Sequence, residues 1–123
     1  MKKSAGFTLI ELVGVMVILA ILAVIAVPQF VDLRTSASDA AVEGVAGALS
    51  SASALNFANE MANSANGIAV ADCQDVEDLL QGGTLPSGYS ITSAAVTPAG
   101  TVVTCTLTGT NSQTATFTAI GVQ

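Results

Sequence analysis

The sequence predicts an α+β protein in which one long N-terminal helix packs, along its second half, on a small antiparallel sheet of about three to four strands. Three observations predict this fold. An apolar run opens the chain, apolar residues then recur at spacings of three and four, and short threonine-rich runs follow Gly67. The first two patterns are typical of apolar and amphipathic helix, and the third is typical of strands separated by turns.

The composition limits the classes of function. The chain has 123 residues, enough for one domain, with nine acidic residues, three basic residues and no histidine, and a net charge of −6. Two of the three basic residues are Lys2 and Lys3, so the chain lacks the positive surface that binds nucleic acid. No nucleophile–base pair, metal-ligand cluster or phosphate-binding loop stands in the sequence, and we therefore expect no enzyme, no cofactor and no metal site.

The apolar run extends from Phe7 to Val31, and Glu11 is its only charged residue. As a helix, about 25 residues measure roughly 37 Å, which exceeds the hydrocarbon thickness of a bilayer, about 30 Å. Lys2 and Lys3 precede the run, and the next basic residue is Arg34. The positive-inside rule therefore predicts a cytoplasmic N-terminus, with everything after Val31 across the membrane.

Three hypotheses explain this run. A secretory signal peptide explains the lysines, but its apolar core normally has about 7–15 residues, and the core from Leu12 to Val27 is slightly longer. A plain single-span anchor explains the length but leaves Glu11 as a carboxylate at membrane depth, which costs about 2.5–3.5 kcal/mol. In the third hypothesis, Glu11 has a partner of opposite charge.

The stretch KKSAGFTLIELVGVMVILAILAVIAVPQF, residues 2–30, resembles the N-terminus of type IV pilins and their pseudopilin relatives. The resemblance implies the type IV pilin fold and a leader at residues 1–6. It also implies that a prepilin peptidase and methyltransferase cleaves between Gly6 and Phe7 and N-methylates Phe7. Glu11 then matches the acid that this family carries four residues after its new first residue, here Phe7.

A helix that includes Phe7 places its new amine about one turn from Glu11, because residues four apart share a helix face. Within one copy the two charges can partly neutralise each other, and in a bundle of staggered copies Glu11 of one copy can meet the Phe7 amine of the next copy. Such pairing removes the cost of an isolated charge in an apolar surrounding, and it fixes the axial register of the copies. Glu11 is therefore the predicted assembly residue.

Pro28 is the second unusual residue in the apolar helix, because its ring removes the N–H that would bond the Val24 carbonyl. Two interpretations remain open, a mild kink and a point where the helix unwinds on assembly. Members of the resembled family usually carry a glycine about two turns before this proline. Here Ala20 occupies that position and the glycine lies earlier, at Gly14, so Gly14 to Pro28 is the segment predicted to kink or unwind.

Residues 32–63 form the predicted amphipathic half of the helix. The helix is expected to end in the cluster of helix-breaking residues from Asn63 to Gly67. The stretch Val42–Ala58, and later Cys73–Leu80 with the following GGTLPSGYSIT, resemble pilins of the mannose-sensitive haemagglutinin type. The predicted apolar stripe consists of Phe30, Leu33, Ala37, Ala41, Val45, Ala48, Ala52 and Leu55.

Residues 64–123 form the predicted connector and sheet domain. Within the connector, Asp72 to Leu80 is predicted to form a short helix with Asp72 as its N-cap and Asp75 in its first turn. In the sheet, alternating threonines face away from the core. The predicted strands are Ser90–Val96, Thr101–Thr108 and Gln113–Ile120, and the predicted core includes Phe57, Tyr89, Ile91 and Phe117.

Two cysteines, Cys73 and Cys105, are either separate buried thiols or a disulfide, and export across the membrane favours the disulfide. Closing a loop of about 33 residues contributes roughly 3.7 kcal/mol in the chain-entropy model. The acids from Asp72 to Asp78 are expected to be a solvated helix face. Related pseudopilins bind calcium through a late loop in the sheet domain, and no acid follows Asp78 here.

The resemblance implies a structural subunit that polymerises into a type IV pilus filament used in adhesion, motility, aggregation or DNA uptake. The implied partners are other pilin subunits, the prepilin peptidase, the inner-membrane assembly machinery and, before assembly, membrane lipid. The chain is then a single-pass inner-membrane protein with a periplasmic C-terminal domain, and later part of an extracellular filament. The alternative is a type II secretion pseudopilin, which the two cysteines and the missing late acidic loop disfavour.

Overall fold

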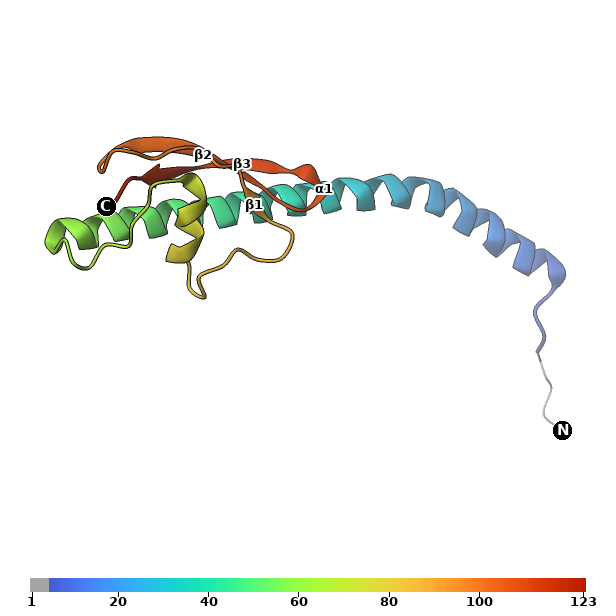
Figure 1. Cartoon of the computed structure of the whole chain (residues 1–123). Helices are drawn as coiled ribbons and strands as arrows, with labels where there is room; N and C mark the ends of the chain where they lie inside the picture. Colours follow the sequence, from blue (N-terminus) through green and yellow to red (C-terminus); the bar gives the residue numbers. More distant parts are fainter. Residues whose placement is uncertain (1–4) are drawn as a thin grey trace. The chain divides into compact units, whose positions relative to one another are not determined.

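The computed structural model describes residues 5–123, which divide into two compact units, one ending at Ser36 and one covering Ala37–Gln123. Helix α1, Leu9–Ala62, belongs to both units (Figure 1). It begins after Thr8 and ends at the predicted breaker cluster, where the Asn63 side chain accepts a hydrogen bond from the Ala65 N–H. The predicted long helix is therefore confirmed.

The first unit consists mainly of the apolar part of α1. Its large side chains are exposed, with Leu9 at 81%, Ile18 at 59% and Ile25 at 64%. This helix is long and apolar enough to cross a membrane, and none of its most apolar 18-residue window is buried inside the chain. Such a surface is stable only when lipid or other protein covers it, because burial of apolar area drives folding and association in water.

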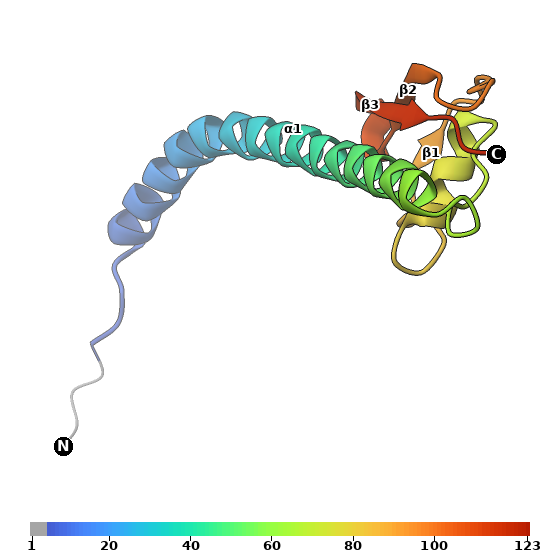
Figure 2. The ribbon, with the colours of Figure 1, turned by 90° about the vertical axis from the view of Figure 1, so that its left-hand side faces the viewer.

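The second unit packs the part of α1 after Ala37 against a three-stranded antiparallel sheet (Figures 1 and 2). Its strands are β1 (Ser90–Ile91), β2 (Val102–Thr108) and β3 (Thr114–Ile120), in the order β1-β2-β3. The 3₁₀ helix η1 (Cys73–Leu79) precedes the sheet, and the short η2 (Thr110–Ser112) joins β2 to β3. The predicted α+β fold is confirmed.

Alternation along β2 and β3 gives the sheet one buried and one exposed face. Cys105 lies opposite Phe117, and both side chains are buried against the core. Of the predicted core residues, Ile91 and Phe117 are buried, while Phe57 and Tyr89 are half-buried at its margin. The outward-facing threonines are exposed apart from Thr108, which is half-buried.

The first predicted strand is too long. Beyond β1, only the Thr92 N–H continues the pairing with β2, by donating to the Thr106 carbonyl. The following residues pair with the segment before η1 instead, since the Cys73 N–H donates to the Ala94 carbonyl and the Val96 N–H to the Ala71 carbonyl. This competing partner, distant in sequence, ends β1 after two residues.

The predicted apolar stripe of the helix is wrong at most of its positions within the second unit, where only Val45 and Ala52 are half-buried. Ala41, Ala48 and Leu55 of that stripe are exposed, and Leu55 reaches 66%. The face of α1 that packs on the sheet lies one residue further along and contains two polar side chains. The buried residues of this face are Val42, Ala46, Leu49, Ser53 and Asn56.

The polar residues turn inward because they hydrogen-bond the backbone of neighbouring segments. Ser50 Oγ accepts from the Thr118 N–H at 3.0 Å, and Ser53 Oγ accepts from the Ile120 N–H at 2.9 Å. Asn56 bridges the Ile68 backbone, donating to its carbonyl at 2.7 Å and accepting from its N–H at 2.8 Å. Since buried polar groups need partners, these bonds select the buried face of α1.

Substitution of Ser53 by alanine is expected to destabilise the second unit by about 1–3 kcal/mol, because it leaves the half-buried Ile120 N–H without an acceptor. Ser51→Ala is the matched control, since Ser51 is exposed on the same helix, and its effect should stay within about 0.5 kcal/mol. Denaturant unfolding of the full chain in detergent measures both. Equal effects of the two substitutions would contradict the role of Ser53.

Gly121 lies where another backbone passes too closely for a side chain. A methyl group at this position would lie 2.5 Å from the Val96 carbonyl oxygen and 2.9 Å from that of Pro98. Gly121→Ala is therefore expected to cost about 1–3 kcal/mol of stability. Gly47→Ala is the control, because Gly47 lies in α1 with open space around it and alanine favours helix by about 1 kcal/mol. Thermal unfolding should move the two variants in opposite directions.

Candidate processing and assembly site

The predicted cleavage residues, Gly6 and Phe7, lie in non-helical backbone before the start of α1. Both are exposed, Phe7 at 89%, and apart from its two chain neighbours no described residue comes within 4 Å of the position that a Gly6 side chain would take. The bond between them is not held in the hydrogen-bonded turns of the helix, whose first residue is Leu9. A peptidase can therefore reach this bond without unwinding α1.

Glu11 lies in the first turn of α1 and closes a reciprocal pair of hydrogen bonds with Thr8. The Thr8 N–H donates to Glu11 Oε2 at 2.8 Å, and the Glu11 N–H donates to Thr8 Oγ1 at 3.4 Å. This is a capping box, with threonine as the N-cap and glutamate three residues later. Sequence reasoning missed the role of Thr8, although the spacing T-x-x-E in residues 8–11 is its signature.

The capping box changes the expected relation between Phe7 and Glu11. The sequence placed both residues in one helix, with their charges about one turn apart. Because Thr8 is the N-cap, Phe7 lies outside the helix, and the i,i+4 geometry does not apply to this pair. Within residues 5–123, Glu11 has hydrogen-bond donors from Thr8 alone.

Gly14 and Pro28 both lie inside α1, which is continuous from Leu9 to Ala62. No atom outside the helix lies within 4 Å of the position that a Gly14 side chain would take. In the isolated chain, α1 therefore keeps its helical turns through both residues. Whether the stretch between them kinks or unwinds in an assembly stays a prediction.

Cys73 and Cys105 form a disulfide with a Cα–Cα distance of 5.9 Å. Cys73 opens η1 and Cys105 lies in the middle of β2, so the bridge ties the connector to the central strand. Both residues are fully buried next to Val76 and Leu107 of the core cluster. No free cysteine remains among residues 5–123.

Two acidic residues at the start of η1, Asp72 and Asp75, cap this helix through hydrogen bonds. Asp72 accepts hydrogen bonds from the Gln74 N–H at 2.9 Å and from the Ser93 hydroxyl at 2.8 Å, which lower the pKa of its carboxyl. Asp75 in turn accepts from the N–H of Asp72 and of Ala71, so a second capping box forms here. The predicted Asp72 N-cap is confirmed, and in the described part of the chain no three metal-binding side chains converge.

The lowered pKa of Asp72 predicts a pH dependence of stability. A carboxyl whose pKa is lower in the folded state stabilises that state above its unfolded pKa, about 3.9, and loses this contribution as the pH falls below it. The wild-type chain is expected to lose more stability between about pH 5 and pH 2 than Asp72→Asn. Unfolding midpoints over this range test the prediction, and parallel curves would contradict it.

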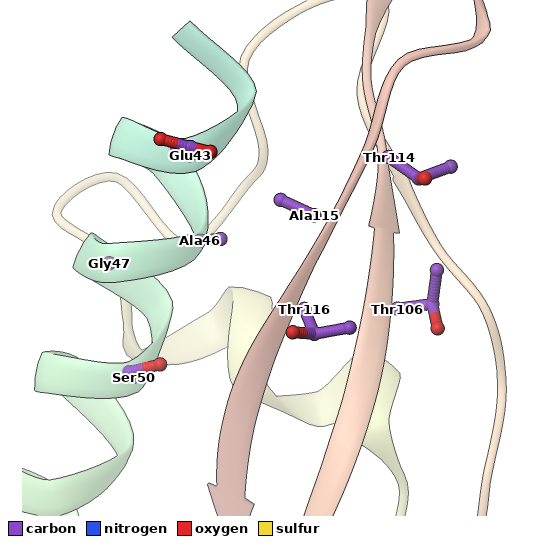
Figure 3. A pocket seen from close by; sticks show the side chains of 8 residues that line it. All are labelled: Glu43, Ala46, Gly47, Ser50, Thr106, Thr114, Ala115 and Thr116. Atoms are coloured by element: carbon purple, nitrogen blue, oxygen red, sulfur yellow. The ribbon is translucent and has the colours of Figure 1, made fainter. Parts of the chain in front are cut away.

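A hollow with a volume of about 500 Å³ lies between α1 and the start of β3 (Figure 3). Glu43 is its single titratable residue, and Ser50, Thr106, Thr114 and Thr116 supply hydroxyls. Figure 3 shows Ala46 and Ser50 pointing from the helix toward the strands. The N–H groups of Thr114 and Thr116 point the same way as that of Thr118, because alternate residues of a strand share an orientation. The hollow therefore exposes a short length of the β3 edge.

Comparison with known families supports the N-terminal site. The model of the prokaryotic N-terminal methylation motif matches residues 1–27. This match supports a type IV pilin-like prepilin. Neither a curated protein nor a solved structure matches the chain. The resemblance of Val42–Ala58 to pilins of the mannose-sensitive haemagglutinin type stays a prediction.

Proposed function

We propose that this chain is a structural subunit of a type IV pilus filament. One observation carries the proposal, namely that the methylation motif coincides with the part of α1 whose apolar side chains are left uncovered by the rest of residues 5–123. A structural subunit needs such a surface twice, first against lipid and then against other copies. The second unit, closed by its own core and disulfide, is the part that a filament would display.

The proposed sequence of events starts in the inner membrane. The chain inserts with its N-terminus in the cytoplasm and its second unit in the periplasm, and residues 1–6 are removed by the prepilin peptidase. The new amine of Phe7 is methylated, and the assembly machinery then moves the apolar helix, residues 7–31, from lipid into the filament core. The amphipathic half of the helix, residues 32–63, faces the core of the filament. The connector and sheet domain, residues 64–123, lies on its outside.

Glu11 has a specific role in this proposal. A carboxylate in the apolar core of a filament requires a positive partner, and the amine of Phe7 on another copy is the charge that cleavage creates. Pairing between copies is favoured over pairing within one copy because Phe7 lies outside the helix that carries Glu11. The ion pair then sets the axial register of neighbouring subunits.

The test is recovery of the filament. Cells that express the chain with its own processing and assembly machinery are sheared, and the fibres are examined by electron microscopy and mass spectrometry. The expected result is this chain as the dominant fibre protein, beginning at N-methylated Phe7. Recovery of the mature chain only from the inner membrane would contradict the pilus proposal and favour a secretion pseudopilin.

A further inference from the structure

We infer that the outer face of the sheet is a contact surface for a second copy of this chain, which packs on it with the same face. The inference rests on the proposed function, because fibres of this chain would present many such faces to one another. The outward side chains that form this surface, called the threonine face below, are Ser90, Thr92, Val102, Thr104, Thr106, Thr108, Thr114, Thr116 and Thr118.

The hydroxyls of the threonine face stand in register across the strands. Thr106 of β2 lies opposite Thr116 of β3, and on its other side the Thr92 N–H donates to the Thr106 carbonyl. A second row of the same kind consists of Ser90, Thr108 and Thr114. Threonine is branched at Cβ, which restricts its χ1 angle, so most of this array is ordered before any partner binds.

The hydroxyls of the threonine face are available to an outside partner. Facing threonines can hydrogen-bond one another and so stabilise a sheet. Within residues 5–123 no such bond joins Thr106 to Thr116, and none joins the facing pairs Thr104–Thr118 and Thr108–Thr114. At the far end of the face, Val102 adds an apolar side chain that is 64% exposed. The face therefore offers both unpaired hydroxyls and uncovered apolar area.

The threonine face carries no charge, unlike the rest of the second unit. All nine acidic residues of the chain lie at or before Asp78, and residues 79–123 contain no acidic or basic residue. The part of α1 after Ala37 carries three acids and no base, and residues 72–78 carry four acids. Two copies therefore repel each other through α1 and η1, whereas two threonine faces meet without like charges.

The composition of β2 and β3 favours an identical face as the partner. Their sequences, VVTCTLT and TATFTAI, are rich in β-branched residues and contain no charge, proline or glycine, which is typical of strands that pack face to face between copies. Each threonine supplies a donor, an acceptor and a methyl group, so the face complements itself. A sugar ligand is disfavoured, because the threonine face has no aromatic ring and no carboxylate. The contact is then two-fold, and a residue at its centre meets its own counterpart.

The size of the threonine face explains why many copies are needed. With strands about 4.8 Å apart and about 6.7 Å between outward side chains of one strand, the face covers about 300 Å² on each copy. Stable complexes bury about 800 Å² on each partner. Isolated copies should therefore stay apart, while copies repeated along two fibres or two membranes bind through many weak contacts at once.

The experiment reconstitutes the full chain at high density in phosphatidylcholine vesicles and follows their clustering by light scattering. Wild-type vesicles should cluster at about 0.5 M NaCl, where the screening length is about 4 Å and the repulsion between acidic copies is weak. Thr106→Glu places a like charge at the centre of the contact and should slow clustering at least about tenfold. Ser51→Glu is the matched control, since it adds the same charge to an exposed position of α1, and its rate should stay within about twofold of the wild type.

A mixture of two vesicle populations tests whether identical faces meet. Vesicles with Thr106→Glu and vesicles with Thr106→Lys should each fail to cluster alone and should cluster when mixed, because the two charges then face each other across the two-fold contact. Mixing Ser51→Glu with Ser51→Lys should give no such gain. Failure of wild-type vesicles to cluster, normal clustering of Thr106→Glu, or no gain on mixing the Thr106 variants would overturn the inference.

Sheared fibres give the second measurement. Wild-type fibres should lie side by side in bundles under the electron microscope, whereas Thr106→Glu fibres should form at normal yield and stay single. Bundles of Thr106→Glu fibres equal to those of the wild type would also contradict the inference. If the wild-type chain forms no fibres, the proposed function fails, and the vesicle measurement alone decides whether the threonine face binds a second copy.

Discussion

Replacement of Glu11 by valine is expected to leave membrane insertion intact and to lower incorporation into filaments by about 100-fold. In the proposed filament, the substitution leaves the amine of a neighbouring Phe7 without its partner in an apolar surrounding. A charge at membrane depth costs about 2.5–3.5 kcal/mol, and each 1.4 kcal/mol corresponds to a factor of ten. Membrane fractionation and quantitative mass spectrometry of sheared fibres measure the two quantities.

Two further variants separate the charge of Glu11 from its hydrogen bonds. Glu11→Gln keeps a side chain that can close the capping box but carries no charge, so it should be nearly as defective as Glu11→Val. Ile10→Val is the matched control, because it alters the neighbouring exposed residue without changing charge or hydrogen bonding. Normal filaments from Glu11→Gln would show that the ion pair is not required.

Removal of the disulfide is expected to lower the free energy of unfolding of the second unit by about 3.7 kcal/mol. Cys73 and Cys105 are 32 residues apart, and the loss follows from the entropy that the unfolded chain regains when this loop opens. For a unit of this size the melting temperature should fall by roughly 15–30 °C. Thermal unfolding of Cys73→Ala/Cys105→Ala measures the change.

Reduction of the wild-type chain is the matched control for the double substitution, because it opens the same loop without changing the sequence. Both treatments should lower the melting temperature to a similar extent, since Cys73 and Cys105 lie in one buried cluster and their side chains are small. A loss below about 1 kcal/mol in both cases would show that the unfolded chain keeps η1 near β2 without the bridge.

The sequence predicts those parts of the fold that depend on local patterns. The apolar run and the alternation of threonines are periodic, and they predict α1, β2 and β3 with errors of one or two residues at the ends. The cap at Asp72 is likewise local, because its partner Gln74 is two residues away. Such features require no knowledge of which distant segments meet.

The failures concern residues whose partners are distant in sequence. Ser53 and Asn56 look like surface residues until Ile120 and Ile68 lie beside them, and their hydrogen bonds then rotate the buried face of α1 by one residue. The shortened β1 has the same cause, since Ala94 pairs with Cys73 rather than with β2. At the N-terminus the spacing T-x-x-E of residues 8–11 is a local signal for a capping box. The family resemblance alone does not reveal this role of Thr8.

The serine bonds from α1 to β3 also have a consequence for the proposed filament subunit, because they cover part of an open strand edge. An open strand edge is a template for strands of other molecules, and many copies stored side by side in one membrane would be exposed to that hazard. Ser50 and Ser53 occupy the N–H groups of Thr118 and Ile120, and Glu43 places a charge beside the short length that remains open. In the proposed filament subunit, these contacts would disfavour association of copies through the edge of β3, and ordered growth would depend on the helix.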